Sequence, residues 1–229
     1  VLGMISNNLK TIAVAGTHGK TTVSTMIAYL LKEAGVKVNA FLGGISRDYG
    51  TNLILDPEAE YMVTEADEYD RSFLQLSPYL SVITSIDADH LDIYTDEADI
   101  VSTYKAFANK TNIEGALLSK QINFDAFGLL NTFRKKTYGL DQGAWINSSN
   151  FRVEDGIMLF DLKIGEEVYK DFSCGLPGIH NIENATAAIA VGVELGIELN
   201  QIKKSLAKFS GVKRSCLLYT SPSPRDGLL

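Results

Sequence analysis

The chain has 229 residues and a formal net charge of −7; 45% of its residues are hydrophobic and 21% are charged, as in an ordinary soluble globular protein. An acidic chain without a basic stripe is not expected to bind nucleic acid, and no apolar run approaches the roughly 20 residues that span a bilayer. Its two cysteines, Cys174 and Cys216, suggest neither a disulfide framework nor a zinc site. We therefore expect a cytoplasmic protein with no nucleic-acid or membrane partner, whereas composition does not indicate an oligomeric state.

The first half of the chain alternates short apolar runs with helical patterns. Strands are expected over 11–15, 36–42, 59–64, 79–85 and near 116–118, and helices over 19–34 and 96–110. Strands that alternate with helices form right-handed βαβ units and hence a parallel sheet. The pattern predicts an α/β fold with a mostly parallel sheet flanked by helices.

Short strands with tight turns replace that alternation in the second half. We expect strands over 136–139, 144–147, 151–154, 157–163 and 167–172, which together predict a small antiparallel sheet attached to the parallel one. Helices are expected over 181–195 and 200–208, the second with Asn200 as its N-cap. Because prolines interrupt 215–229, we expect this segment to be disordered or foreign to the fold.

A glycine-bearing loop joins the first expected strand to the first expected helix. Its residues are Gly16, Thr17, His18, Gly19, Lys20, Thr21 and Thr22. Backbone N–H groups at a helix N-terminus bind anions, a nearby lysine reaches the β- and γ-phosphates, and a threonine hydroxyl binds Mg²⁺. Val14 stands where the strict phosphate-loop pattern has a glycine, so this loop is a shorter variant. Its place between a strand and a helix nevertheless predicts nucleotide binding.

Polar residues also follow the third and fourth expected strands, at the sheet edge where ligands bind in open parallel sheets. Glu65 follows the third strand and is a candidate Mg²⁺ ligand beside a phosphate loop. We interpret the other acidic residues of that run, Asp67, Glu68 and Asp70, as ordinary loop charges. His90, after the fourth strand, is either a metal or anion contact or a structural histidine.

Three further segments have two interpretations each. His18 either shapes the phosphate loop or contacts the ligand, and His180 either caps a helix or faces a nucleotide base. The glycine-bearing loop 43–52, which includes Arg47, either contacts a second, anionic substrate or is a surface turn.

Four motifs in chain order resemble the Mur ligases. They lie at Gly16–Thr22, Glu65–Glu68, Asp87–Asp92 and Pro177–Asn184, within a likeness that covers about residues 1–214. The resemblance implies that ATP is bound by Gly16, Thr17, His18, Gly19, Lys20, Thr21, Thr22, His180, Asn181 and Asn184. It also implies Mg²⁺ on Thr21, a metal-bridging carboxylate at Glu65 and a second-metal ligand at His90. Lys20, Glu65 and His90 are then the catalytic residues, and carbamylation of Lys105 as a further metal ligand stays open.

The resemblance implies ATP-driven amide formation, in which a substrate carboxylate attacks the γ-phosphate and an amine then displaces phosphate from the acyl phosphate. The most similar branch of the family joins L-alanine to UDP-N-acetylmuramate during peptidoglycan precursor synthesis. Two alternatives remain, namely a related ligase such as one that recycles murein peptides, and an ATP-binding fragment without ligase activity.

Mur ligases have three domains, so the resemblance also implies a domain organisation. We expect residues 1–10 to end an N-terminal UDP-binding domain or linker and 11–210 to form the central ATP-binding domain. Residues 211–214 would then enter a C-terminal domain, to which 215–229 bear no likeness. The expectation is an incomplete chain.

Overall fold

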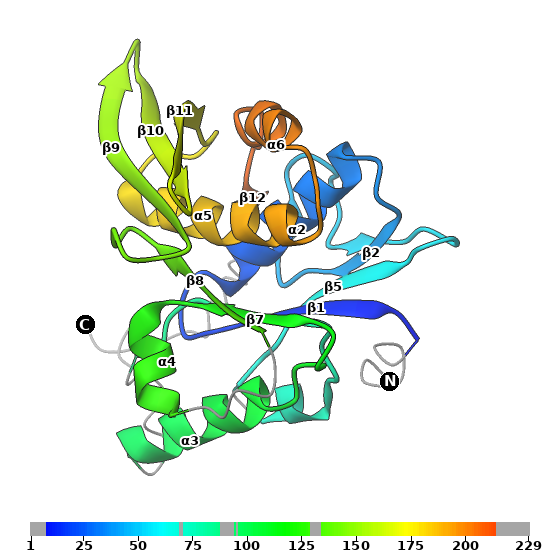
Figure 1. Ribbon diagram of the computed structural model, residues 1–229. Coiled ribbons are helices and arrows are strands. Elements are labelled where there is room, and N and C mark those ends of the chain that lie inside the picture. Colours follow the sequence, from blue (N-terminus) through cyan, green and yellow to red (C-terminus); the bar gives the residue numbers. More distant parts are fainter. Residues whose placement is uncertain (1–7, 69–70, 88–93, 95, 129–133, 214–229) are drawn as a thin grey trace, which may run out of the picture.

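The structure, a computed structural model, describes residues 8–68, 71–87, 94, 96–128 and 134–213 (Figure 1). Its strands are β1 (Lys10–Ala15), β2 (Val38–Phe41), β3 (Ile45–Ser46), β4 (Leu53–Ile54), β5 (Tyr61–Glu65), β6 (Leu80–Ile83), β7 (Ala116–Ser119), β8 (Arg134–Gly139), β9 (Ile146–Glu154), β10 (Ile157–Ile164), β11 (Glu167–Ser173) and β12 (Val212–Lys213). Its helices are α2 (Lys20–Glu33), the 3₁₀ turn η1 (Ser72–Gln75), α3 (Glu97–Ala108), α4 (Gln121–Phe127), α5 (Ile179–Glu194) and α6 (Leu199–Leu206).

In the described part of the chain, the main sheet has the strand order β11-β10-β9-β8-β7-β6-β1-β5-β2-β4. Pairing is parallel from β2 through β5, β1, β6 and β7 to β8, which confirms the predicted mostly parallel α/β fold. Strand β1 lies between β5 and β6, with Val14 opposite both Glu65 and Val82. The glycine loop after β1 therefore leaves the sheet between the ends of two strands that carry polar residues.

Helices cover both faces of the sheet (Figure 1). On one face α2 and α5 pack against alternate residues of β1, Ile12 and Val14, in the larger core cluster. On the other face α3, α4 and η1 pack against Ala13 and Ala15 in a second cluster. The alternation follows from the period of a strand, whose successive side chains point to opposite faces. Both faces of β1 are buried, so its position is determined by packing from two sides.

The antiparallel part extends the main sheet, and two details of its prediction are wrong. Strand β8 pairs parallel with β7, and β9 is one strand where the sequence predicted two. Asn150 has a left-handed backbone (φ 51°), and the register with β10 shifts there. This β-bulge lets β9 continue through residues whose sequence is typical of a turn.

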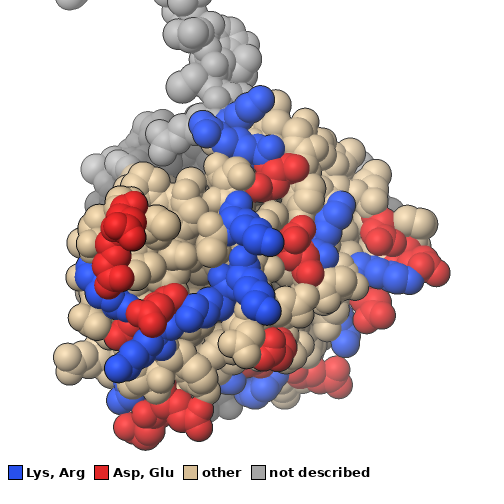
Figure 2. All heavy atoms as spheres, turned by 90° about the horizontal axis from the view of Figure 1, so that it is seen from above, with Lys and Arg blue, Asp and Glu red and all other residues tan. Residues whose placement is uncertain are grey.

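Figure 2 shows basic and acidic side chains interleaved on the face seen from above.

The predicted helix ranges agree with the structure better than the predicted N-cap residue does. The helix expected over 19–34 is α2, which begins at Lys20 with Gly19 as its N-cap. The N-cap of α6 is Glu198, whose side chain accepts a hydrogen bond from the Gln201 N–H, so the assignment of Asn200 is wrong. Asn200 instead donates its amide to the Glu198 carboxylate. No helix in the described residues is long and apolar enough to cross a membrane.

Candidate nucleotide-binding site

The glycine loop is fastened to the end of β6 and needs its glycines. Thr17 N–H donates to Ser85 O at 2.8 Å, and the Thr84 hydroxyl donates to His18 O at 2.5 Å. Gly16 and Gly19 have φ values of 137° and 85°, which side chains rarely adopt. A Cβ at Gly16 would clash with Thr84 Oγ1. The loop therefore presents its backbone at the N-terminus of α2, where the helix dipole favours an anion.

Lys20 lies in the first turn of α2 and is held by acceptors of the protein itself. Its Nζ donates to Gly16 O at 2.7 Å and to both carboxylate oxygens of Glu68 at 2.9 Å. The Glu68 side chain is only 3% exposed. The interpretation of Glu68 as an ordinary loop charge is therefore wrong, because a solvated loop residue would not be buried against this lysine.

Glu65 ends β5 beside Thr21, as the strand-end argument predicted. The Thr21 hydroxyl donates to Glu65 Oε2 at 3.1 Å, and Gly43 N–H donates to Glu65 Oε1 at 2.6 Å. Ser24 donates a third hydrogen bond at 3.3 Å. A carboxylate and a hydroxyl at this separation are hard oxygen donors of the kind that Mg²⁺ takes beside phosphates, so the pair fits that ion.

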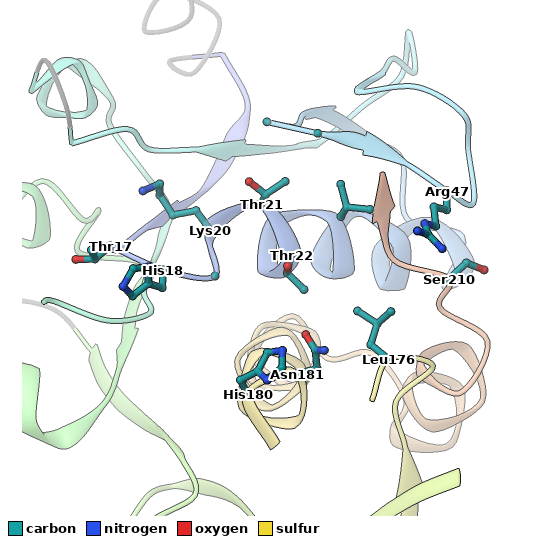
Figure 3. Close-up of a pocket in the computed structure, with 14 residues that line it drawn as sticks. Thr17, His18, Lys20, Thr21, Thr22, Arg47, Leu176, His180, Asn181 and Ser210 are labelled. Atoms are coloured by element: carbon teal, nitrogen blue, oxygen red, sulfur yellow. The ribbon is translucent and has the colours of Figure 1, made fainter. Parts of the chain in front are cut away.

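His180, Asn181 and Asn184 lie on the first turns of α5, which packs against α2. His180 is exposed and Asn181 is half-buried, with its amide donating to Pro177 O at 2.6 Å. A Cβ at Gly19 would lie 2.6 Å from Asn184 Oδ1, so Gly19 permits the close approach of α5 to the loop. Figure 3 shows His180 and Asn181 below the start of α2.

Two neighbouring cavities join these elements. One, of about 610 Å³, runs along the start of α2 and is lined by Thr17, His18, Gly19, Lys20, Thr21, Thr22, Gly43, Gly44, Arg47, Leu176, His180, Asn181, Ser210 and Val212 (Figure 3). The other, of about 510 Å³, is bounded by His18, Gly19, Thr22, Thr84, Ser85, Asp87, Lys120, Tyr138, His180, Asn181, Glu183 and Asn184. Together the two cavities offer room for an elongated ligand that extends from the start of α2 to α5.

The second cavity contains residues that the sequence reasoning missed. Lys120 forms an ion pair with Glu183 at 2.7 Å across this cavity. Tyr138 is buried and donates its hydroxyl to Ile83 O at 3.0 Å; burial, and to a lesser degree the charge of Glu183, raises the pKa of this phenol. No local pattern groups these residues, because Lys120 follows β7, Tyr138 lies on β8 and Glu183 lies on α5, so they meet only in the fold.

Several predicted site residues are not tested by this geometry. His90 lies outside the described residues, and so do Asp89 and Asp70. Within the described ranges, no group of three or more His, Cys, Asp or Glu side chains is arranged to hold a metal. His18 Nε2 lies 3.7 Å from Asp87 Oδ2, at the edge of the loop. Lys105 is exposed on α3, and its carbamylation stays a prediction.

Comparison with known proteins agrees with this arrangement. The Mur ligase middle domain matches residues 14–192, and the chain therefore belongs to the Mur ligase family. The UDP-N-acetylmuramate–L-alanine ligase of Christiangramia forsetii is 44% identical over 93% of this chain and 45% of its own length. That of Phocaeicola vulgatus is 43% identical over 93% of this chain and 46% of its own length. The chain thus spans about half the length of these relatives.

Solved structures of the same family have the same fold. The UDP-N-acetylmuramate:L-alanyl-gamma-D-glutamyl-meso-diaminopimelate ligase of Neisseria meningitides superposes with a TM-score of 0.83 at 26% identity, covering 93% of this chain and 70% of that one. The UDP-N-acetylmuramate–alanine ligase of Thermotoga maritima has a TM-score of 0.78 at 24% identity, covering 93% and 49%.

Proposed function

We propose that this chain is the ATP-binding part of a ligase that joins L-alanine to UDP-N-acetylmuramate through an acyl phosphate, in peptidoglycan precursor synthesis. The observation that carries the proposal is the meeting of Lys20, Thr21 and Glu65 at the N-terminus of α2. The relatives at 43–44% identity, which are alanine ligases, support this choice of substrates.

Each group of the site has a separate task in the proposed reaction. The N–H groups of the glycine loop and the start of α2 bind the phosphates, and Lys20 stabilises charge that develops on their oxygens. Thr21 and Glu65 hold Mg²⁺, which when bound neutralises phosphate charge. His180, Asn181 and Asn184 contact the adenine side of the nucleotide, and His90 remains the proposed ligand of a second metal.

Arg47 is proposed to contact the second, anionic substrate. It lies on the wall of the larger cavity, near Ser210 and at a distance along α2 from the phosphate loop (Figure 3). Its backbone N–H donates to Gly211 O at 2.9 Å, which joins the 43–52 loop to the segment that the resemblance assigns to the entry of a third domain. A cation there suits a carboxylate or a phosphate.

A second candidate is a ligase that adds a murein peptide, which the fold similarity to the Neisseria protein favours. The two candidates share the ATP site and differ in the incoming amine. Turnover of the complete protein with L-alanine or with a murein tripeptide separates them. Faster turnover with the tripeptide would overturn the assignment to L-alanine.

The nucleotide site itself is tested on this chain by titration with Mg-ATP. Wild type is expected to bind, and Lys20→Ala to bind about 10- to 100-fold more weakly, the range for loss of charged hydrogen bonds. Lys37→Ala is the matched control, because Lys37 lies at the amino end of β2, away from the glycine loop at the carboxyl ends of the strands, and pairs with Glu58. Equal affinity of wild type and Lys20→Ala for Mg-ATP would contradict the assignment of this loop as a phosphate-binding loop.

A further inference from the structure

The lysine of the proposed phosphate loop is already paired with an anion in this structure. A lysine ammonium carries three N–H groups, and Lys20 has three acceptors, namely Gly16 O and the two oxygens of Glu68. Figure 3 shows Lys20 on the other side of the start of α2 from His180 and Asn181. A phosphate oxygen that approaches Lys20 therefore meets an ammonium group already paired with the Glu68 carboxylate.

The backbone of Glu68 is held by residues that do not line the ligand cavities. The Tyr94 hydroxyl donates to Glu68 O at 2.7 Å, and Arg71 N–H donates to the same oxygen at 3.1 Å. Burial raises the pKa of Tyr94 to about 12, with the charge of Glu68 as the next cause. An ionised carboxylate so little exposed to water needs a cationic partner, and Lys20 is the partner that the structure provides.

Of the two kinds of acceptor, Glu68 is the one that resembles the ligand. Its two oxygens present Lys20 with an anionic pair of acceptors, whereas Gly16 O is a neutral carbonyl of the loop itself. An arriving β- or γ-phosphate offers anionic oxygens to the same ammonium group. The carboxylate therefore competes with the phosphates, and the loop carbonyl does not.

We propose that Glu68 is a positioning residue for Lys20, the counter-ion that holds the ammonium group until the phosphates of the nucleotide displace at least one of its oxygens. The inference rests on the proposed ATP site. Exchange of the hydrogen bond lowers the affinity for ATP, because Glu68 loses part of its pairing when the nucleotide binds. In return, the ammonium group stays at one position above Gly16 O while the site is empty of phosphate.

The test is a double-mutant cycle on Mg-ATP affinity, measured by calorimetric titration of the whole chain. Glu68→Gln keeps the shape and removes the competing charge, so it is expected to tighten binding about three- to tenfold, the range of one net hydrogen bond. In a Lys20→Met background the same change is expected to leave the affinity unchanged, because Glu68 acts through the lysine. Glu194→Gln, a buried carboxylate away from the loop, is the control.

Each result bears on the proposal. The proposal is overturned if Glu68→Gln does not raise the affinity for Mg-ATP. It is also overturned if the affinity rises equally with and without Lys20, because the effect would then come from the general electrostatic field and not from the lysine. If wild type does not bind Mg-ATP, the proposed function fails and the inference falls with it. If wild type binds and the cycle shows no coupling, only the inference fails.

Should Glu68→Gln not fold, the wild-type chain still provides a measurement. The side-chain ammonium signal of Lys20 in nitrogen-15 NMR, assigned by its loss in Lys20→Met, is expected in the nucleotide-free protein because its hydrogens are held by three acceptors. Mg-ATP is expected to shift this signal. A signal that does not move while ATP binds would show that the Glu68 pair stays intact, and would overturn the proposal.

Discussion

Two carboxylates of this chain, Glu68 and Glu194, are equally buried, with side chains only 3% exposed, yet their surroundings differ. Glu68 follows β5 and pairs with Lys20, which lines the larger cavity. Glu194 ends α5 and lies 2.7 Å from both Arg134 and Lys136 on β8, the second of which also lies over the Trp145 ring. Neither of these cations lines either of the two cavities beside the glycine loop.

Burial of an ion pair does not by itself indicate function. A buried carboxylate such as Glu194, whose two cations line neither cavity beside the glycine loop, contributes to stability and not to ligand binding. Glu68, by contrast, is paired with a cation that lines the proposed phosphate site, so the proposal couples this carboxylate to ligand binding. The two pairs therefore differ in whether the cation can bind a second anion, namely a ligand.

The largest expected effect comes from removing the shared cation. Lys20→Met leaves Glu68 buried without its partner and is expected to destabilise the fold by about 3 kcal/mol, the lower end for breaking a buried pair. Urea denaturation measures this loss. The double variant Lys20→Met with Glu68→Gln is expected to regain more than half of the stability, but not ATP binding. A single variant as stable as wild type would contradict the account of Glu68.

The second largest effect is expected at Glu65, the other carboxylate of the proposed site. Glu65 accepts hydrogen bonds from Thr21 and Gly43 and has no cationic partner among the ion pairs of the described residues. Glu65→Gln is expected to raise the Mg²⁺ concentration needed for ATP binding about tenfold, because an amide is a weaker ligand for a hard cation. Glu58→Gln, an exposed change, is the control. An unaltered Mg²⁺ dependence would remove Glu65 from the metal site.

A smaller effect is expected at the structural pair. Glu194→Gln is expected to cost about 1 kcal/mol, since its partners Arg134 and Lys136 are partly exposed and can turn to water. Thermal and urea unfolding measure the loss, and Mg-ATP affinity is expected to stay within twofold of wild type. A large loss of ATP affinity would show that this pair is coupled to the site after all.

The smallest effect is the pH dependence that Tyr94 contributes. Its pKa is raised by burial to about 12 in the folded chain, against the ordinary value of 10.0. A raised pKa means that the folded state holds the proton more tightly, so this stabilisation is complete below about pH 10 and is lost as pH rises towards 12. Tyr94→Phe is expected to unfold with a shallower pH dependence between these values. Parallel curves for the two proteins would refute the assignment.

Prediction from sequence succeeded where a short segment carries its own signal. The strand–loop–helix unit from β1 to α2 was predicted because its apolar periodicity and glycines are local. The position of Glu65 beside this loop was predicted because polar residues at parallel strand ends meet at one edge, while its role as a metal ligand stays a prediction. It failed at β9, where a bulge at Asn150 continues a strand through a polar run. It failed also at α6, where Glu198 caps the helix in place of Asn200.

By itself, therefore, the sequence determined the α/β class, the glycine loop between β1 and α2 and the family, because each depends on the order and spacing of residues along the chain. Tertiary structure alone decided that Glu68 is buried against Lys20, while the neighbouring Asp67 is exposed. Burial depends on which elements pack over a residue, and here Tyr94 and the start of α2 come from distant parts of the chain. The acidic run that contains Glu68 does not indicate by its sequence which residues pack against it.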